Sequence, residues 1–460
     1  MSINSFDNYP MSWKPVLQRG DKPIYIELAD QLETDIANGV LRPGTQLPPQ
    51  RELADFLNIN VSTVSRAFRI CTQKGLLLGT VGKGTFVAYD VATNIFSQPQ
   101  VKQTHLIQLG SMVPETISQN EVTNLLKTML SEPNASALFQ YTQIVPEWQQ
   151  KAAASLLLRA GCRTATERIL TASGGQNAIS CIFAGLFQPG DRIGTDPLIY
   201  PGIKSAAKLF GIQLVPIAQE HGEMSAEGIQ YAIKNEHIKG LYVMPDFQNP
   251  TTHSMSDACR EMIADISQKE NIIVIEDGIN SLLMETPMNA IATAAPNQTI
   301  YICSLSKTIL PALRLAYISV PLGWKKKIED ALYAINLSQS TLLTELAARL
   351  IASGKMDALL ARRRKGIMQR NELTDNILCD CTVWGNNKSL NRWLILPSGM
   401  TGEQFERLAL QHGVFVYGSD RFVVGKEKTV EAARLAICAP NSLDELEQGL
   451  TILKTLLQGQ

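Results

Sequence analysis

The sequence lacks the residue clusters that mark metal sites, disulfide frameworks and membrane spans. Its five histidines are scattered from His105 to His412, and of its eight cysteines only Cys379 and Cys381 lie close together. This distribution contains no readable zinc ligand set or disulfide framework and fits reduced thiols in a cytosol. No apolar run approaches the roughly 18 residues that a membrane-spanning helix needs, and residues 1–22 lack the basic start and apolar core of a signal peptide. We therefore expect a cytoplasmic protein without a metal.

Length and charge suggest several domains, one of them locally basic. The chain has 460 residues, which exceeds the length that a single hydrophobic core usually supports. Its 45% hydrophobic and 18% charged residues are typical of globular proteins. The net charge of −1 gives no global sign of a nucleic-acid partner. Residues 41–90, however, hold six basic residues against three acidic ones.

Helical periodicity and chain breakers predict three helices followed by a hairpin in residues 23–88. Apolar residues recur at helical spacing from Ile24 to Ile36 and stop at Asn38-Gly39. The expected elements that follow are a helix over 50–57, a helix over about 61–73 that Asn60 can cap, and a hairpin around a Gly-Lys-Gly tip between 79 and 84. This order is that of a winged helix-turn-helix.

Such a module has a direct physical use on double-stranded DNA. The third helix can enter a major groove while the second braces it, and a glycine-rich hairpin tip can approach the backbone or the minor groove. The candidate DNA-binding residues are Arg51, Thr63, Arg66, Arg69 and Lys83. A small protein-binding domain is the alternative reading of the same elements.

The motifs of this region carry a specific likeness. Leu-Pro-Pro-Gln-Arg-Glu-Leu-Ala, Ser-Thr-Val-Ser-Arg-Ala-Phe and Gly-Lys-Gly-Thr-Phe-Val resemble the GntR family of bacterial regulators across nearly all of residues 23–88. One departure is Asn60-Val61, where that family often has a Ser-Arg pair. We assign residues 1–89 to a winged helix-turn-helix DNA-binding domain and 90–104 to a linker.

The remaining residues, 105–460, predict an α/β domain with a smaller lobe over about 335–460. Helical stretches alternate with short apolar runs at 241–244, 272–275, 299–303 and 316–320. This alternation indicates a largely parallel sheet with helices on both faces, in which ligands bind at the carboxyl ends of the strands.

Candidate phosphate-binding residues follow two apolar runs, 169–170 and 299–303. A glycine pair between an apolar run and a helix exposes backbone amides and a positive helix end to an anion, although alone it is often only a turn. Hydroxyls and a guanidinium near Lys307 suit the same anion. The candidates are Gly174, Gly175, Gln176, Ser304, Ser306 and Arg314.

Four further residues suit a pyridoxal 5'-phosphate site. Lys307 would form a Schiff base, or aldimine, with the cofactor, and Asp277 would keep the ring nitrogen protonated. Asn249 would donate to the phenolic oxygen, and Tyr200 would stack on the ring. Taken singly, each has a plain alternative as surface charge, helix cap or core residue. The separations of 28, 30, 7 and 120 residues that link Asn249, Asp277, Lys307, Arg314 and Arg434 resemble those of fold-type I aminotransferases.

With both parts considered, the chain resembles the MocR subfamily of GntR regulators, in which a winged helix is fused to a fold-type I aminotransferase-like domain. This resemblance implies that Arg434 binds the carboxylate of an amino-acid effector, which a bidentate guanidinium suits. It also implies a head-to-tail homodimer in which Tyr141 reaches the neighbouring site. The expected partners are an operator DNA and a small amine or amino acid.

Departures from that pattern favour sensing over turnover. Ile279 stands where relatives commonly have a tyrosine that bonds the ring hydroxyl, and residues 145–150 replace a Gly-Leu-Arg type of segment.

Three hypotheses stay open: a regulator that senses an amine through the Lys307 aldimine, an active aminotransferase with an autoregulatory DNA-binding domain, and a regulator that senses the cofactor itself. The basic run at 362–365 is expected to be a solvated helix face rather than a second DNA contact.

Overall fold

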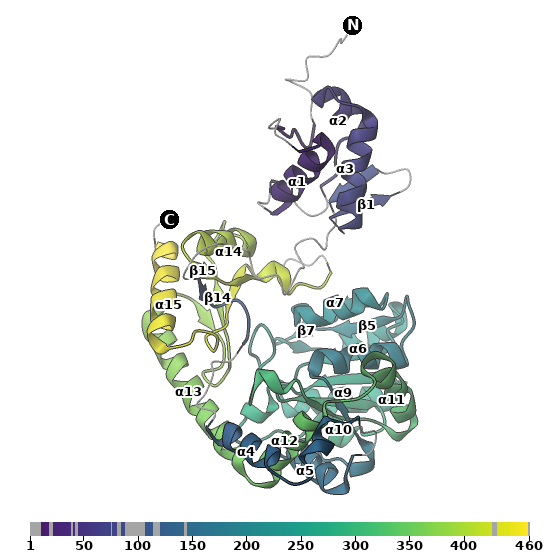
Figure 1. The fold of residues 1–460 in the computed structure, drawn as a ribbon, viewed down its shortest axis with the longest axis vertical. Coiled ribbons are helices and arrows are strands. Elements are labelled where there is room, and N and C mark those ends of the chain that lie inside the picture. The colour runs from purple at the N-terminus through teal and green to yellow at the C-terminus, as the bar shows by residue number, and fades with distance from the viewer. Residues whose placement is uncertain are drawn as a thin grey trace. The chain divides into compact units, whose positions relative to one another are not determined.

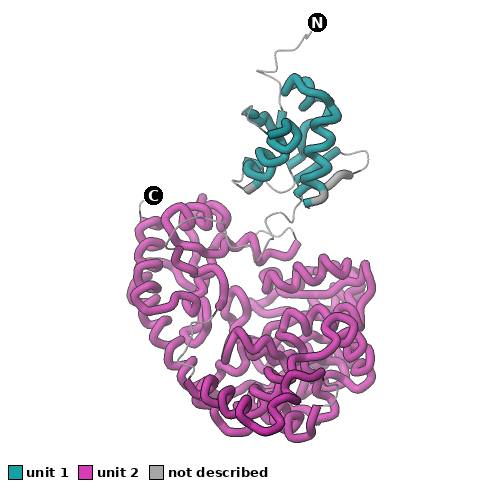
Figure 2. Tube along the Cα trace, viewed as in Figure 1, with its two compact units in different colours: residues 1–100 teal, residues 101–460 magenta. Residues whose placement is uncertain are grey.

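The chain divides into two compact units, residues 1–100 and 101–460 (Figure 2). The computed structural model describes residues 11–17, 22–37, 40–41, 45–74, 76–80, 84–87, 106–113, 120–141, 145–425 and 430–458. The expected linker at 90–104 lies outside them, as do Gly82 and Lys83 of the Gly-Lys-Gly tip. Each unit has its own core of buried apolar side chains.

The first unit contains the expected three helices and hairpin. Helices α1 (Ile24–Ala37), α2 (Gln50–Leu57) and α3 (Val61–Gln73) precede the antiparallel strands β1 (Leu77–Thr80) and β2 (Gly84–Val87) (Figure 1). Their core forms because each helix directs one apolar stripe inward. That core includes Leu28, Leu32, Leu53, Val64, Phe68 and Val87. The predicted winged helix-turn-helix is therefore confirmed.

One detail of this unit differs from the expectation. Asn60 occupies the position before α3 in an extended conformation, but its side chain makes no capping hydrogen bond. The turn is instead closed by the backbone, because the Thr63 amide donates to the Asn60 carbonyl at 2.9 Å. The prediction of a side-chain cap at Asn60 was wrong.

A seven-stranded sheet organises the second unit, in the order β4-β12-β11-β10-β9-β5-β6. Its strands are β4 (Ile169–Ala172), β5 (Arg192–Thr195), β6 (Gln213–Pro216), β9 (Gly240–Val243), β10 (Ile273–Asp277), β11 (Thr299–Ser304) and β12 (Ala316–Ser319). Only β12 pairs antiparallel with its neighbours, and the other pairs are parallel. The largely parallel sheet is thus confirmed.

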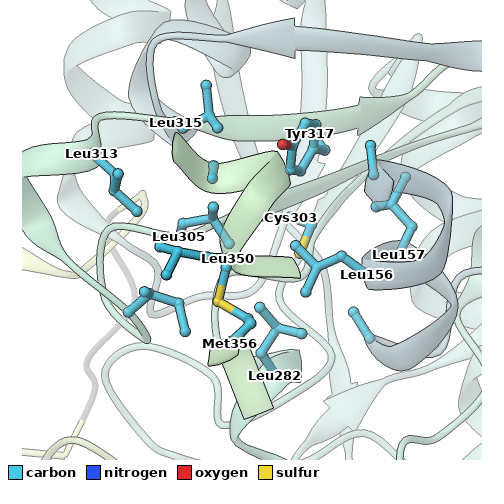
Figure 3. Packing of buried hydrophobic residues seen from close by; sticks show 14 of the residues in the cluster. Leu156, Leu157, Leu282, Cys303, Leu305, Leu313, Leu315, Tyr317, Leu350 and Met356 are labelled. Carbon is cyan, nitrogen blue, oxygen red and sulfur yellow. The ribbon is translucent and has the colours of Figure 1, made fainter. Parts of the chain in front are cut away.

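Alternate residues of the central strands enter cores on opposite faces, as the period of two requires. Ile300 and Ile302 of β11 pack against α6 (Gly175–Leu186), α7 (Pro201–Leu209) and α11 (Leu322–Asn336). Tyr301 and Cys303 face the other way, into a cluster built with α5 (Glu147–Arg159), α12 (Thr341–Ala352) and the start of α13 (Lys355–Ile377) (Figure 3). Helices α8 (Ala226–Asn235), α9 (Asp257–Glu270) and α10 (Ile291–Ala294) cover the β9 side of that face.

The C-terminal lobe is a four-stranded sheet, in the order β13-β14-β17-β16, with its helices. It comprises β13 (Val383–Trp384), β14 (Arg392–Ile395), β16 (Tyr417–Gly418), β17 (Ala432–Leu435), α14 (Gly402–Gln411) and α15 (Leu443–Gln458). Beside it, β3 (Ile107–Gln108) pairs parallel with β15 (Val414–Phe415). The strand β3 thereby joins the start of the second unit to its C-terminal lobe.

Shorter elements complete the second unit. They are α4 (Asn120–Leu130), β7 (Gln219–Glu220), β8 (Glu223–Met224) and the 3₁₀ turns η3 (Ala135–Phe139), η4 (Thr166–Arg168), η5 (Ser281–Leu283), η6 (Pro311–Leu313) and η7 (Ser419–Arg421).

The basic run at 362–365 lies on α13 and is mostly not a solvated face. Arg363 is buried, and Arg364 donates to the carbonyl oxygens of Leu282, Leu283 and Met284 around η5. Arg362 pairs with Glu121 of α4 at 2.6 Å. The expectation of a solvated face was wrong because these guanidiniums satisfy backbone and side-chain acceptors of neighbouring elements.

We expect Gly161→Ala to destabilise the second unit by about 3 kcal/mol, which combines backbone strain with steric overlap. Gly161 has φ +88°, and an added Cβ would overlap the Met288 carbonyl oxygen. The matched control is Gly190→Ala, at φ +92° with no atom within 4 Å of the new Cβ. It should cost about 1–2 kcal/mol from the left-handed backbone alone. Urea unfolding of the full chain measures both, and equal losses would contradict the close approach at Met288.

Candidate functional site

The candidate residues of the second unit gather at the carboxyl edge of the seven-stranded sheet. Gly174 follows β4, Tyr200 follows β5, Asn249 follows β9, Asp277 ends β10 and Lys307 follows β11. These five strands point the same way, so their carboxyl ends share one edge. Sequence positions up to 133 residues apart therefore converge in one site.

Lys307 is a largely enclosed amine at this edge. Its Nζ donates to the carbonyl oxygen of Met112. The pKa of Lys307 is lowered to about 8, mainly by burial. The Cys438 thiol opposes this lowering, and the positive charges of Arg434 and Arg314 contribute to it. A larger fraction of this amine is therefore neutral and nucleophilic near neutral pH than of an exposed lysine.

Asp277 is a buried carboxylate with one oxygen left over. Its Oδ2 accepts from the Tyr242 hydroxyl of β9 at 2.7 Å, while Oδ1 has no hydrogen-bond partner among the described residues. Burial raises the pKa of Asp277 to about 6, and the Tyr242 hydroxyl opposes that rise. A carboxylate held this way is suited to a positively charged or proton-donating partner.

A cup of backbone and hydroxyl groups lies at the start of α6. Gly174 precedes the helix at φ +91°, and a Cβ there would lie 3.0 Å from Arg314 Nη2. Arg314 is exposed and makes only long hydrogen bonds, at 3.4 Å to Ser306 Oγ and 3.5 Å to the Ser173 carbonyl. The Ser306 amide donates to Ser304 Oγ at 3.4 Å. The bare amides, two hydroxyls and an incompletely used guanidinium form an anion-binding arrangement.

Tyr200, Gln176 and Gly202 lie in mutual contact beside this cup. Gln176 Nε2 donates to the Gly202 carbonyl at 2.8 Å, and a Cβ at Gly202 would overlap both the Tyr200 ring and Gln176 Oε1. Burial raises the pKa of Tyr200 to about 12, with a further rise from the charge of Asp277. The phenol therefore stays neutral and provides a flat apolar face within electrostatic range of Asp277, Arg434 and Arg314.

Arg434, on β17, is a buried cation that contacts neutral groups among the described residues. It donates from Nη1 to Asn249 Oδ1 at 2.8 Å and from Nη2 to the Gly110 carbonyl. Its Cζ lies 5.1 Å from the Tyr417 ring centroid and 5.0 Å from that of Phe422. Burial lowers the pKa of Arg434 to about 10. Within the described part of the chain, no carboxylate forms an ion pair with this guanidinium.

The structure thus brings together ten of the expected residues around Lys307 and adds others that the sequence did not indicate. The ten are Asn249, Asp277, Tyr200, Gly174, Gly175, Gln176, Ser304, Ser306, Arg314 and Arg434. The additions are Gly110, Met112, Tyr242, Tyr417, Phe422 and Cys438. Asn249 uses its oxygen toward Arg434, which leaves its Nδ2 as the donor that we expected to face a ligand.

Two other positions singled out in the sequence add no polar group to this set. Tyr141 is 82% exposed beyond η3, and Ile279 packs on the apolar cluster that also contains Tyr200. An isoleucine there offers no hydroxyl to a ligand.

In the first unit, the candidate DNA-binding residues line the outer face of α2 and α3. Arg51, Arg66 and Arg69 are exposed and Thr63 is partly exposed. The Arg66 guanidinium lies 5.5 Å from the Tyr25 ring centroid, which restrains it on the helix surface.

Each unit matches a known family over its own part of the chain. Residues 24–87 match the family described as "Bacterial regulatory proteins, gntR family", and residues 104–452 match "Aminotransferase class I and II". Among the described residues, no helix is long and apolar enough to cross a membrane.

The chain is similar to transcription regulators and to an aminotransferase of known structure. The chain is 50% identical over 458 residues to the HTH-type transcriptional regulator YdeF of Bacillus subtilis (strain 168), covering 99% of each. It is 24% identical to the probable rhizopine catabolism regulatory protein MocR of Rhizobium meliloti, covering 78% of each. An archaeal alanine:glyoxylate aminotransferase structure superposes with a TM-score of 0.71 at 22% identity, over 81% of this chain and 95% of that one. With a GntR helix-turn-helix fused to a class I and II aminotransferase domain, the chain belongs to the MocR subfamily of GntR-type bacterial transcription regulators.

Proposed function

We propose that the second unit binds pyridoxal 5'-phosphate and senses a small amine or amino acid that reacts at Lys307, and that this event changes DNA binding by the first unit. The observation that carries the proposal is the buried Arg434, which lies within electrostatic range of Lys307 and has no anionic partner in the described part of the chain. An isolated buried charge is costly unless a counter-ion or dense hydrogen bonding offsets it. A ligand carboxylate is the natural counter-ion.

The class I and II aminotransferase fold implies pyridoxal phosphate, and two features of this chain fit that group. The unpartnered Oδ1 of Asp277 is a buried acceptor suited to a protonated ring nitrogen. The cup formed by Gly174, Arg314 and Ser306 has the amides and spare guanidinium donors that a phosphate needs. Both features concern atoms that the protein itself leaves incompletely bonded.

Bound pyridoxal phosphate supplies an aldehyde that condenses with primary amines and a ring that withdraws electrons. Lys307 Nζ is the nucleophile, favoured by its depressed pKa of about 8. Asp277, oriented by the Tyr242 hydroxyl, would keep a ring nitrogen protonated. Arg434 would orient an incoming carboxylate, and Tyr200 offers an apolar face on which a ring would stack.

Sensing is favoured over turnover by Ile279. Its apolar side chain leaves the ring hydroxyl without the tyrosine donor that relatives place there, which reduces control over ring electronics. The competing functions are an active aminotransferase and a sensor of the cofactor itself. The aminotransferase would produce oxo acid steadily, whereas the DNA affinity of the cofactor sensor would not respond to amines.

We also propose a head-to-tail homodimer in the cytoplasm. Phe139 and Tyr141 are 70% and 82% exposed, and Leu337 is 48% exposed. The turn between Phe139 and Tyr141 is bonded to the start of α12, because Thr341 Oγ1 donates to the Gln140 carbonyl at 2.7 Å. Large apolar side chains exposed on neighbouring turns favour a protein interface, and Tyr141 would reach the partner's site from there.

The test of the proposed function is Lys307→Ala in the full chain loaded with pyridoxal phosphate. The variant should lose the visible absorption band of the covalently held cofactor and the response of DNA affinity to amines. Lys326→Ala, at an exposed lysine of α11, is the matched control and should retain both. Absorption spectra and DNA titrations with a panel of amino acids and amines give the readouts. A Lys307→Ala protein that keeps the band would refute the site.

We expect Asp277→Asn to stabilise the cofactor-free protein at neutral pH while weakening cofactor retention by about tenfold, the effect of one lost charge-assisted hydrogen bond. Because folding raises the pKa of Asp277 from 3.8 to about 6, its ionised form is disfavoured in the folded state. Wild-type stability therefore falls as pH rises from about 4 to 6, and the variant should gain up to about 3 kcal/mol above that range.

Unfolding of the cofactor-free variant and wild type at several pH values measures this gain, which should vanish below about pH 4. Asp265→Asn, at an exposed carboxylate of α9, is the control and should show no such gain. A variant that is no more stable at neutral pH would contradict the cost assigned to burying Asp277.

We expect Arg69→Ala to weaken DNA binding and to lower the slope of log affinity against log salt by about one, as loss of one phosphate contact does. Its cofactor band should be unchanged because Arg69 lies on α3 in the first unit. Lys151→Ala removes the same charge from α5 and should leave the slope unchanged. Identical slopes for both variants would exclude Arg69 as a DNA contact.

A further inference from the structure

Residues 106–113, here called the strap, begin the described part of the second unit and run directly through the site. The first part of the strap is bonded to the C-terminal lobe: Leu109 N donates to the Phe415 carbonyl at 2.8 Å, and Ala436 N donates to the Leu109 carbonyl at 2.7 Å. The next part turns toward the ligand-binding groups, where the carbonyls of Gly110 and Met112 accept from Arg434 and Lys307.

Those two hydrogen bonds engage the two cationic groups that an amino acid would need. Arg434 is the group suited to a carboxylate, and Lys307 is the amine at which the proposed chemistry takes place. A carbonyl oxygen is a neutral acceptor, whereas a carboxylate carries a full negative charge and can accept from two guanidinium nitrogens at once. The Gly110 carbonyl therefore occupies the place of an anion that would bind Arg434 better.

The strap fits this position closely, so it cannot share it with a ligand. A Cβ on Gly110 would lie 2.8 Å from Phe415 Cδ1 and 3.3 Å from Tyr417 Cδ1, so the backbone lies directly against these rings. Met112 is 8% exposed and packs with Phe247, Leu283 and Cys438. A ligand that takes Arg434 must move the Gly110 carbonyl.

The position of the strap in the chain gives this movement a consequence. Eighteen residues, 88–105, separate it from the end of β2 in the DNA-binding unit. The strap is thus the part of the ligand site closest in sequence to the winged helix. Its other contacts, through Ile107 and Leu109, hold it to the C-terminal lobe and not to the ligand-binding groups.

We propose that the strap is a built-in competitor of the effector: the Gly110 carbonyl holds Arg434 in the effector-free protein and is released when a carboxylate-bearing amine binds. The Met112 carbonyl holds Lys307 only while that amine carries no cofactor. Release alters the anchoring of the chain that leads to the winged helix, and so couples ligand occupancy to DNA affinity. This inference rests on the proposed function, because it assumes that the first unit binds DNA and that the ligand takes Arg434.

The experiment compares full-length wild type, Gly110→Ala and Arg434→Ala, all without effector. Gly110→Ala forces the strap away from the rings of Phe415 and Tyr417. Arg434→Ala removes the guanidinium that donates a hydrogen bond to the Gly110 carbonyl of the strap. Hydrogen exchange of the peptide spanning 106–113 should accelerate by about tenfold or more in both, as expected for loss of a hydrogen bond to a charged group. DNA affinity should shift in the same direction in both, by about fivefold or more.

Gly194→Ala is the matched control for crowding. Its Cβ would lie 2.7 Å from Ile217 Cδ1 and 2.8 Å from Leu241 Cδ2, in the seven-stranded sheet and away from the strap. It should change neither strap exchange nor DNA affinity. If Arg434 serves only to bind the effector, its loss should leave the effector-free protein unchanged, and that result would overturn the proposal.

Two further outcomes separate the strap from the proposed function. Faster strap exchange with unaltered DNA affinity would overturn the coupling. If wild type binds no DNA, the proposed function fails, and the competitor role is then decided by exchange alone: acceleration in both variants supports it and its absence refutes it. Gly110→Ala keeps the buried charge intact, so a folding defect of Arg434→Ala does not remove the test.

Discussion

The ligand site depends on one constraint: the buried guanidinium of Arg434 has no carboxylate partner within the part of the chain that the structure describes. Burying a charge costs several kcal/mol unless it is paired or fully hydrogen-bonded. The protein offsets this cost at Arg434 with the oxygen of Asn249, the carbonyl of Gly110 and the faces of Tyr417 and Phe422. These groups come from three separate parts of the chain, so the same cation organises the loop after β9, the C-terminal lobe and the strap.

The two cations of the site belong to different parts of the second unit. Lys307 follows β11 of the seven-stranded sheet, while Arg434 lies on β17 of the C-terminal lobe. A ligand that contacts both joins two sheets, and any preference it has for one arrangement of them shifts the population of that arrangement. A fold in which a ligand can change the arrangement of two sheets is therefore also suited to sensing that ligand. In the proposed function, the DNA affinity of the first unit responds to this change.

Much of this organisation could be predicted from the sequence because local patterns determine it. The spacing of apolar residues from Ile24 to Ile36 predicted the first helix. Polar residues at the ends of apolar runs, such as Asp277, indicated the carboxyl edge of the sheet. Parallel strands place their carboxyl ends together, so Asn249, Asp277 and Lys307 could be assigned to one site without coordinates.

The remaining features depend on contacts that no local pattern encodes. Met112 and Gly110 contact Lys307 and Arg434 across 195 and 324 residues, and through backbone carbonyls that every residue possesses. The partner of Asp277, Tyr242, stood in an apolar strand and looked like core. The basic run at 362–365 was misjudged because the acceptors of Arg364 lie some 80 residues away around η5.

The most direct measurement titrates the pyridoxal-phosphate-loaded protein with amino acids and with the amines that lack only their carboxylate, following visible absorption and DNA affinity together. An amino acid that acts should bind about tenfold or more tightly than its matched amine, because Arg434 gains a charge-assisted partner, and both signals should saturate together without oxo-acid product. Equal affinities for acid and amine, or steady product formation, would contradict the role of Arg434 in sensing.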